Sequence, residues 1–263
     1  MRGSQLDGVL DFTGKVVLVT GGVSGIGAGI SARFLEAGAD VVACSRRAPA
    51  ELPQHDGRTV DYQSCDVRKA AECRALIERV VDKHGRLDAL INNAGGSVEV
   101  PSADADPALT EKIIQLNLTA PFFMSQAAYQ VMHQQPTGGS IVNISSVSAA
   151  RASPWSAAYG AAKAGLVNLT ESLAMEWGPK NIRVNALIVG LVATPNSLTH
   201  YGGSEGVARI GEMLPLRRMG EPQDVADACL FLCSPLAAYV SGAQIAVHGG
   251  GEKPIFLDLA RRS

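Results

Sequence analysis

The sequence predicts an α/β fold in which helices flank a doubly wound, parallel, seven-stranded sheet. Three observations support this prediction. Aliphatic and β-branched runs recur along the 263 residues, segments with helical spacing of apolar residues separate them, and no linker rich in Pro, Gly or Ser divides the chain. With 46% hydrophobic residues, a chain of this length can bury a large core, so we predict a single domain over residues 1–263.

The expected strands are short and almost continuously apolar, which is typical of strands that are buried on both faces of a parallel sheet. They are Lys15–Thr20, Ala39–Ser45, Thr59–Asp66, Leu87–Asn92, Ser140–Ser145, Arg183–Ile188 and Ala243–Val247. After the first of them, Ile26, Ile30 and Phe34 recur every four residues and predict an amphipathic helix. Longer crossover helices are expected over Pro107–Met132 and Ser156–Trp177.

Two later regions are expected to lie outside the sheet. Residues 189–218 are the least regular stretch, with Pro195 and Pro215 and a length that a plain connection does not need, so they predict a lid over a substrate or an insertion. The tail, residues 249–263, carries Ile255, Phe256 and Leu257, which a monomer would expose. We therefore expect the tail to pack on a neighbouring subunit.

The charge balance argues against nucleic acid and membrane as partners. The chain has 23 Lys and Arg against 25 Asp and Glu, so no global positive field attracts it to a polyanion. No apolar run approaches the roughly 18 residues of a membrane span, and residues 1–14 lack the apolar stretch of a secretory signal. The sequence therefore predicts a cytoplasmic protein.

Cysteine and histidine positions predict no metal site. The five cysteines contain no Cys-x-x-Cys pair, and their odd number fits a reducing compartment better than a disulfide framework. They are Cys44, Cys65, Cys73, Cys229 and Cys233, for which core packing is the expected role. No histidine pairs with an acid at ligand spacing, so no catalytic metal is expected.

A glycine-rich turn follows the first strand and opens the first helix. In the run from Thr20 to Gly27, glycines stand at positions 21, 22, 25 and 27. Glycines there allow positive φ and let a pyrophosphate approach the N–H groups at the positive end of a helix. Gly21, Ser24, Gly25, Ile26 and Gly27 are therefore candidate cofactor ligands. The alternative is a tight turn without a ligand.

The spacing of this turn and four later motifs resemble the short-chain dehydrogenase/reductase family in its compact, non-extended form. The later motifs are Asn93-Ala94-Gly95, Asn117, Ser146 and Tyr159-x-x-x-Lys163, in that order. A lone Tyr-x-x-x-Lys is a weak signal, but ordered matches on the expected elements span nearly the whole chain. The resemblance implies a Rossmann-like sheet and a nicotinamide cofactor. It also implies that Asn93, Ala94 and Gly95 border the adenosine ribose.

Within that resemblance, four residues form the catalytic set. Tyr159 and Lys163 are four residues apart and share one face of the expected helix. Tyr159 would be the general acid/base, Lys163 would lower the pKa of that tyrosine and bind the nicotinamide ribose, and Ser146 would hold the substrate oxygen. Asn117 would bend its helix around a water that relays protons to Lys163. Taken singly, each residue also has an ordinary structural role available.

The second strand favours NADP(H) over NAD(H). Its tip reads Ser45-Arg46-Arg47 and lacks the carboxylate that would repel a 2′-phosphate, whereas a guanidinium pairs well with one. Two solvated arginines on a loop are the alternative reading, and NAD(H) is the alternative cofactor. Asp66, followed by Val67, matches the family's adenine contact, and Asp66 also suits the N-cap of the helix expected near Arg68.

After the sixth strand the chain departs from the family, which usually has Pro-Gly where this sequence has Val189-Gly190. The fixed φ of proline is lost, which leaves the geometry of the turn open. Gly190, Val192 and Thr194 still match the positions that contact the nicotinamide carboxamide.

The resemblance implies an NAD(P)-dependent oxidoreductase that interconverts a ketone and a secondary alcohol. Candidate substrate contacts are mainly apolar and predict a medium-sized apolar or cyclic substrate, with Arg151 as one candidate anion holder; they are Val98, Val147, Arg151, Trp155, His200, Tyr201 and Met213. A catalytically silent nucleotide-binding regulator and a non-redox epimerase or dehydratase are the alternatives. The expected assembly is a homotetramer, with a dimer as the alternative.

Overall fold

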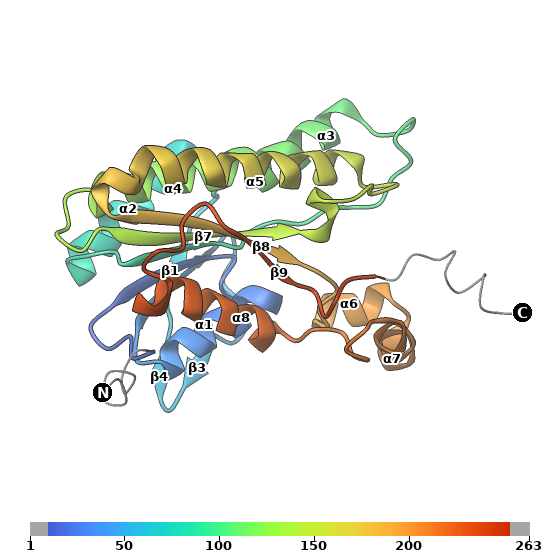
Figure 1. The fold of residues 1–263 in the computed structure, drawn as a ribbon, viewed down its shortest axis with the longest axis horizontal. Coiled ribbons are helices and arrows are strands. Elements are labelled where there is room, and N and C mark those ends of the chain that lie inside the picture. The colour runs from blue at the N-terminus through green and yellow to red at the C-terminus, as the bar shows by residue number, and fades with distance from the viewer. Residues whose placement is uncertain (1–9, 253–263) are drawn as a thin grey trace, which may run out of the picture.

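A seven-stranded parallel sheet forms the centre of the computed structural model, which describes residues 10–252 (Figure 1). The strand order is β5-β2-β1-β6-β7-β8-β9, with two halves that wind outward from β1 and β6. The strands are β1 (Val16–Thr20), β2 (Asp40–Ser45), β5 (Asp61–Ser64), β6 (Ala89–Asn92), β7 (Gly139–Ser146), β8 (Ile182–Val189) and β9 (Gln244–Val247). This sheet confirms the predicted fold class and the seven predicted strand regions.

Helices cover both faces of the sheet (Figure 1). On one face lie α1 (Gly25–Glu36) and α8 (Pro222–Cys233), which pack against each other. On the other face lie α2 (Ala70–His84), α4 (Ala120–Met132) and α5 (Ala157–Trp177). The helix α3 (Pro107–Ile114) precedes α4, and single 3₁₀ turns occupy Val147–Ala149, Gly178–Lys180 and Pro235–Ala237.

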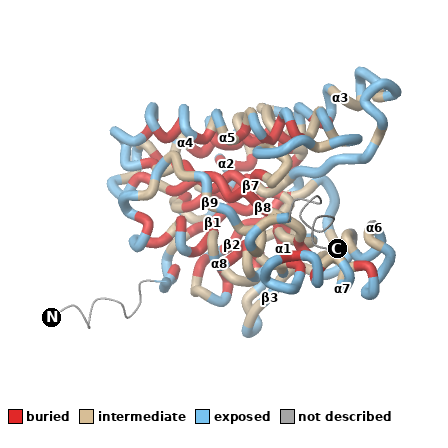
Figure 2. Tube along the Cα trace, turned by 45° about the vertical axis from the view of Figure 1, so that its right-hand side comes forward, coloured by how far each residue is buried: buried red, intermediate tan, exposed pale blue. Residues whose placement is uncertain are grey.

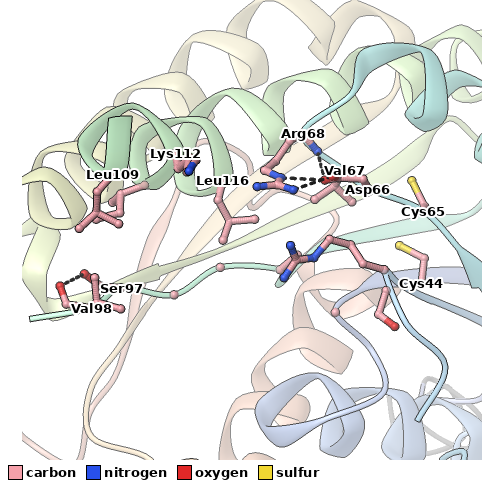
Figure 3. A pocket seen from close by; sticks show the side chains of 17 residues that line it. Cys44, Cys65, Asp66, Val67, Arg68, Ser97, Val98, Leu109, Lys112 and Leu116 are labelled. Atoms are coloured by element: carbon pink, nitrogen blue, oxygen red, sulfur yellow. Dashed lines mark hydrogen bonds and ion pairs between the residues drawn. The ribbon is translucent and has the colours of Figure 1, made fainter. Parts of the chain in front are cut away.

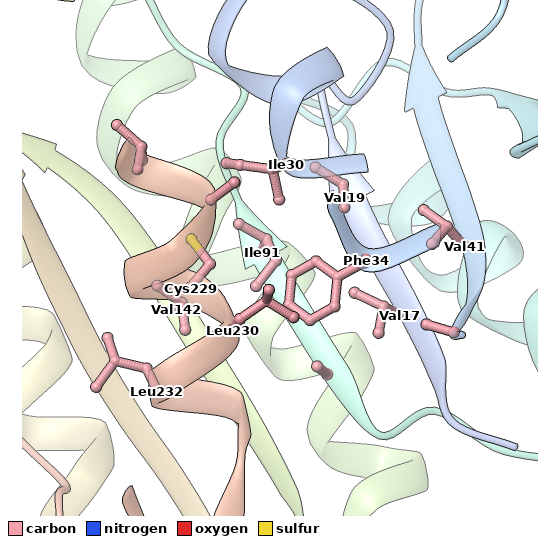
Figure 4. Close-up of a cluster of buried hydrophobic side chains, with 14 of the residues drawn as sticks. Val17, Val19, Ile30, Phe34, Val41, Ile91, Val142, Cys229, Leu230 and Leu232 are labelled. Carbon is pink, nitrogen blue, oxygen red and sulfur yellow. The ribbon is translucent and has the colours of Figure 1, made fainter. Parts of the chain in front are cut away.

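The alternation of side chains along β1 creates two hydrophobic cores. Val17 and Val19 point to the α1/α8 side, whereas Val16 and Leu18 belong to the core under α2, α4 and α5. In the first core, Phe34 of α1 lies among Val17, Ile91 and Leu230 (Figure 4). Buried positions concentrate along the strands and inner helix faces, while α3 and the region around α6 and α7 are largely exposed (Figure 2).

Two local features were not predicted. The expected strand Thr59–Asp66 is divided, because residues 54–59 form a separate hairpin of β3 (Gln54–His55) and β4 (Arg58–Thr59). Asp56 and Gly57 make its turn, both with positive φ, as Asp-Gly does in two-residue hairpin loops. The expected helix over 107–132 is interrupted by a π-helical turn at Gln115–Thr119.

The region predicted to be the lid is more regular than its composition indicated. It contains α6 (Pro195–His200) and α7 (Gly203–Met213), which lie together beyond one end of the sheet (Figure 1). Thr194 and Ser197 cap the start of α6 reciprocally. Of the predicted tail, residues 253–263 lie outside the described residues. Between residues 10 and 252, no helix is long and apolar enough to cross a membrane.

Candidate active site

Three adjoining cavities lie where the strands end. The first, about 400 Å³, is lined by the ends of β2 and β5, and it shares Gly21 and the segment Ala94–Gly96 with the second, of about 350 Å³. The second shares Ser146, Tyr159 and Gly190 with the third, of about 850 Å³. A ligand that extends through the first two cavities would therefore reach the third at Tyr159.

The glycine-rich turn lines the second cavity, and its first glycine, Gly21, also lines the first. Gly21 and Gly25 adopt positive φ, and a Cβ on Gly27 would overlap the carbonyl oxygen of Gly21. The Ser24 side chain makes no capping hydrogen bond to α1. The N–H groups of the first turn of α1 therefore remain available to an anion at the positive end of the helix. Ile26 lines the second cavity and also packs against the α1/α8 core.

Hydrogen bonds hold the end of β6 against the end of β1. The Thr20 hydroxyl accepts hydrogen bonds from the backbone N–H groups of Asn93 and Ala94, each at 3.0 Å. The Asn93 side chain donates back to the Thr20 carbonyl oxygen at 2.9 Å. Asn93, Ala94 and Gly95 all line the second cavity.

The first cavity brings Ser45 and Arg46 together with Asp66, Val67 and Arg68. The last three are labelled in Figure 3. Arg68 donates two side-chain hydrogen bonds to the Asp66 carboxylate, at 2.8 and 2.6 Å. These bonds lower the pKa of Asp66 to about 2. Asp66 also accepts from the Arg68 backbone N–H, but α2 begins at Ala70 with Lys69 as its N-cap, so Asp66 caps a turn before the helix.

Of the predicted cofactor residues at this end, Arg47 does not line the first cavity. Its carbonyl oxygen accepts a hydrogen bond from the Ser45 hydroxyl at 2.6 Å, which orders the tip of β2. Ser45 and Arg46 therefore remain the candidates that face the cavity.

Two cysteines in the first cavity were not predicted as site residues. Cys44 lies next to the last residue of β2, and Cys65 directly follows β5. Because these two strands pair in parallel, both cysteines lie in the wall of the first cavity (Figure 3). The Cys73 thiol donates a hydrogen bond to the Val67 carbonyl oxygen at 3.2 Å, and burial contributes to raising the pKa of both Cys44 and Cys73. The position of Cys65 next to a predicted ligand was the available sequence signal.

Asn117 lies in the π-helical turn and is fully buried. Its side-chain amide donates to the carbonyl oxygens of Ile113, at 2.9 Å, and Gly96, at 2.8 Å. Its side-chain oxygen accepts from the Gly96 N–H at 3.0 Å. Asn117 thus ties the irregular turn to the segment that borders both the first and second cavities.

Lys163 is buried at the base of the second cavity, with 4% of its surface exposed. Its ammonium group donates to the Ile144 carbonyl oxygen at 2.8 Å and lies 5.6 Å from the centre of the Tyr159 ring. Burial lowers the pKa of Lys163 to about 8. The neighbouring Ser145 hydroxyl donates to the Lys163 carbonyl oxygen, so Ser145 has a structural role.

Tyr159 and Ser146 stand at the junction of the second and third cavities. Burial raises the pKa of Tyr159, and the neighbouring Ser146 hydroxyl lowers it, which offsets part of that rise. The sequence led us to expect that Lys163 lowers this pKa, but desolvation by burial is the larger effect.

The segment after β8 keeps its shape without the proline. Val189 completes β8, and the Gly190 N–H donates to the Val247 carbonyl oxygen at 3.0 Å. Gly190 and Thr194 line the second cavity, and the Thr194 side chain also caps α6. Val192 is buried, pairs with Gly220 and does not line the second cavity.

The residues around the first two cavities fit a nicotinamide dinucleotide. A Cβ at Gly27 would fill the space beside the Gly21 carbonyl oxygen at the start of α1. From Gly21, the first cavity extends to Arg46 and the second extends to Lys163. Within residues 10–252, no group of three or more His, Cys, Asp or Glu side chains is arranged to hold a metal ion. The donor set therefore suits phosphate and ribose groups.

The third cavity contains four of the seven expected substrate contacts. Val98, Val147, Arg151 and Tyr201 line it. Trp155 and Met213 do not, and both are exposed at the surface. The side chain of His200 lies outside the described part of the structure.

Comparison with known proteins gives consistent matches over most of the chain. Residues 21–252 match the family model described as Enoyl-(Acyl carrier protein) reductase. Human dehydrogenase/reductase SDR family member 4 is 37% identical, covering 90% of this chain and 87% of that protein. The 7alpha-hydroxysteroid dehydrogenase of Escherichia coli K12 is 36% identical, covering 92% and 96%.

A solved structure shows the same fold. The ligand-free aldohexose dehydrogenase of Thermoplasma acidophilum has a TM-score of 0.84 and 31% identity, covering 91% of this chain and 94% of that one. With its parallel sheet, its glycine-rich turn and these relatives, the chain belongs to the short-chain dehydrogenase/reductase family of NAD(P)-dependent oxidoreductases.

Proposed function

We propose that the protein interconverts a ketone and a secondary alcohol, with NADP(H) preferred and Tyr159 as the general acid/base. The observation that carries the proposal is the position of Tyr159. It lies with Ser146 at the junction between the second cavity, which the glycine-rich turn lines, and the open third cavity. A substrate carbonyl there would meet both hydroxyl groups at once.

In this mechanism, bound NADP(H) supplies or accepts the hydride. During reduction, the Tyr159 hydroxyl donates its proton to the substrate oxygen, and it takes that proton back during oxidation. Ser146 donates a hydrogen bond to the same oxygen and fixes its position. Because burial keeps the pKa of Tyr159 above its ordinary value, the tyrosine is protonated at neutral pH and suits the donating step.

In the proposal, Lys163 and Asn117 assist Tyr159 by relaying protons and by binding the nicotinamide ribose. A Cβ on Gly95 would lie 2.8 Å from the Asn117 side-chain oxygen and 3.2 Å from the Lys163 ammonium nitrogen, so both polar groups face the same small space. In the proposal, a water there passes protons toward Lys163, and the ammonium group binds the nicotinamide ribose.

The preference for NADP(H) rests on the first cavity. Arg46 and Arg68 line it, and the Asp66 carboxylate, which could repel a phosphate, is already bonded to Arg68. We expect a higher kcat/KM with NADPH than with NADH, and Arg46→Ala to reduce that ratio by about 10-fold or more. Equal efficiency with both cofactors in the wild type would contradict this preference.

The relatives do not decide the substrate, because their names refer to steroid and aldohexose substrates. The sequence predicted a medium-sized apolar or cyclic compound. A panel of ketones and secondary alcohols, followed at the nicotinamide absorbance, tests the reaction class directly. Product formation without a change in that absorbance would support the epimerase or dehydratase alternative.

Tyr159→Phe tests the catalytic assignment. We expect kcat to fall by about 10²-fold or more, because proton transfer is lost, while NADPH binding measured by fluorescence stays within about twofold. Tyr239→Phe is the control, because Tyr239 is fully exposed and lines none of the three cavities. Wild-type turnover by Tyr159→Phe would refute the role of Tyr159.

A further inference from the structure

The third cavity has more hydroxyl groups than the sequence led us to expect. Ser148, Ser153 and Ser156 line it and are half-buried, in the segment that joins β7 to α5. Among residues 10–252, none of these three side-chain hydroxyls forms a hydrogen bond. By contrast, the hydroxyl of Ser197 in the same wall is used by the cap of α6.

The segment that carries the three serines is held in place by its backbone. The Ser156 N–H donates to the Ser153 carbonyl oxygen at 3.1 Å, and the Val100 N–H donates to the Trp155 carbonyl oxygen at 2.8 Å. Gly160 lets the segment pack closely on α5, since a Cβ there would lie 3.1 Å from the Ser148 carbonyl oxygen. The hydroxyls are therefore presented from a fixed backbone beside Tyr159.

A bound substrate would remove water from these hydroxyls. An apolar substrate would leave them without partners, and each buried hydroxyl that lacks a hydrogen bond weakens binding. A substrate that carries several hydroxyl groups would replace the water and satisfy them. The lining thus discriminates between substrates by hydrogen bonding. A pocket that hydrogen-bonds a substrate group rejects compounds lacking that group more strongly than an apolar pocket rejects a compound of the wrong size.

The charges around the third cavity argue against an anionic substrate. Arg151 is the one cationic residue in its described lining. Its guanidinium is already paired with both carboxylate oxygens of Glu252, at 2.7 and 2.6 Å. Glu252 and Glu99 also act on Tyr201 in the same wall, where burial and then these two carboxylates raise the pKa of the phenol.

We propose that the third cavity takes a neutral, polyhydroxylated substrate such as an aldose or a polyol. This inference rests on the proposed function for the site of reaction, and it replaces the apolar substrate that the sequence predicted. Arg151, a candidate anion holder from the sequence, instead closes the cavity wall through Glu252.

The test compares three sets of compounds of similar size with the purified enzyme and its cofactor. They are neutral aldoses and polyols, the corresponding aldonic and uronic acids, and substituted cyclohexanols and cyclohexanones. Calorimetric titration of the enzyme–cofactor complex measures binding separately from turnover. We expect the neutral polyhydroxylated set to bind at least about 10-fold more tightly than either other set.

The outcomes separate this inference from the proposed function. Tighter binding or faster turnover of the cyclohexanols overturns the inference and leaves the oxidoreductase assignment intact. Binding of aldoses without any turnover supports the inference and contradicts the proposed function. Absence of aldose and polyol binding overturns the inference whatever else the enzyme turns over.

Two sets of variants test the residues themselves. Ser148→Ala and Ser153→Ala are each expected to raise KM for the best polyol or aldose by about 2- to 10-fold. Ser102→Ala is the control, because Ser102 is exposed and lines none of the three cavities. Glu252→Gln frees Arg151 and is expected to raise kcat/KM for the acids relative to the neutral compounds by about 10-fold.

Glu78→Gln, at an exposed position of α2, is the matched control for that charge change. Adding Arg151→Ala to Glu252→Gln should cancel the gain for the acids. An unchanged ratio in Glu252→Gln, or serine variants with wild-type KM, would overturn the proposed lining.

Discussion

At the residue scale, the buried ammonium of Lys163 is stabilised less by the folded protein than by water. When folding lowers the pKa of a lysine from 10.5 to about 8, the free energy of unfolding at neutral pH falls by roughly 3 kcal/mol. Because the unfolded chain holds this proton more tightly, the free energy of unfolding rises as pH increases from about 8 to above 10.5.

Lys163→Met should therefore stabilise the ligand-free protein while abolishing turnover. Loss of the hydrogen bond to Ile144 offsets about 1 kcal/mol, so we expect a net gain of about 1–2 kcal/mol at pH 7. Urea denaturation at pH 7 measures it, and Lys180→Met at an exposed position is the control. A clear loss of stability in Lys163→Met would show that the ammonium group is not penalised by burial.

The same pKa predicts the pH profile of carbonyl reduction. Tyr159 stays protonated because burial raises its pKa, whereas Lys163 loses its charge as pH rises through about 8. We therefore expect kcat/KM for reduction to fall above a pH of about 8, since this parameter reports the free enzyme. Lys163→Arg, which keeps its charge, should move the fall to higher pH if it retains activity. A flat wild-type profile from pH 7 to about 9.5 would contradict this assignment.

At the element scale, the turn between β1 and α1 depends on close backbone approach. A Cβ on Gly27 would overlap the Gly21 carbonyl oxygen and approach the Asn93 amide at 2.5 Å. Gly27→Ala should lower stability by about 1–3 kcal/mol and weaken NADPH binding, because the start of α1 must move. Gly178→Ala is the control, since its Cβ would meet no atom within 4 Å and its φ is −51°. Wild-type NADPH affinity in Gly27→Ala would argue against cofactor binding at the start of α1.

The elements differ in how far the sequence predicts them. The central strands were predictable because continuous apolar runs such as Val16–Leu18 are buried on both faces of the sheet. The π-helical turn was not, because it depends on the Asn117 side chain bonding Ile113 and Gly96 together, and Gly96 is 21 residues away. The Asp56-Gly57 hairpin carries a recognisable turn signal just before the expected strand Thr59–Asp66, but its two-residue strands are too short to show an apolar pattern.

The same distinction applies within the site. The residues that we propose as catalytic, such as Ser146 and Tyr159, stand on or next to regular elements, so ordered motifs predicted their proximity. The third cavity is built by loops, where the sequence gives no side-chain direction. Pairing of Arg151 with Glu252 joins positions 101 residues apart, and no local pattern could show it.

At the scale of the whole molecule, two surfaces of the described chain could contact further copies. One carries small and apolar side chains, and the other is a strand edge. The outer face of α5 exposes Ala161, Ala164 and Met175, which are spaced to lie along one side of the helix. Strand β9 is an edge strand that pairs only with β8 among residues 10–252, and Tyr239, five residues before it, is exposed. Unprotected edges and apolar helix faces favour association with further copies.

We predict a homotetramer in which these two surfaces form two separate two-fold interfaces. Light scattering coupled to gel filtration should give about 110 kDa for four chains of 27.4 kDa. Ala164→Glu places a charge on the α5 face and should reduce the mass to about 55 kDa, because only one interface survives. Ala71→Glu, at an exposed position of α2, should leave the mass unchanged. A monomeric wild type would mean that both surfaces face water, and a tetramer that persists in Ala164→Glu would place the helical interface elsewhere.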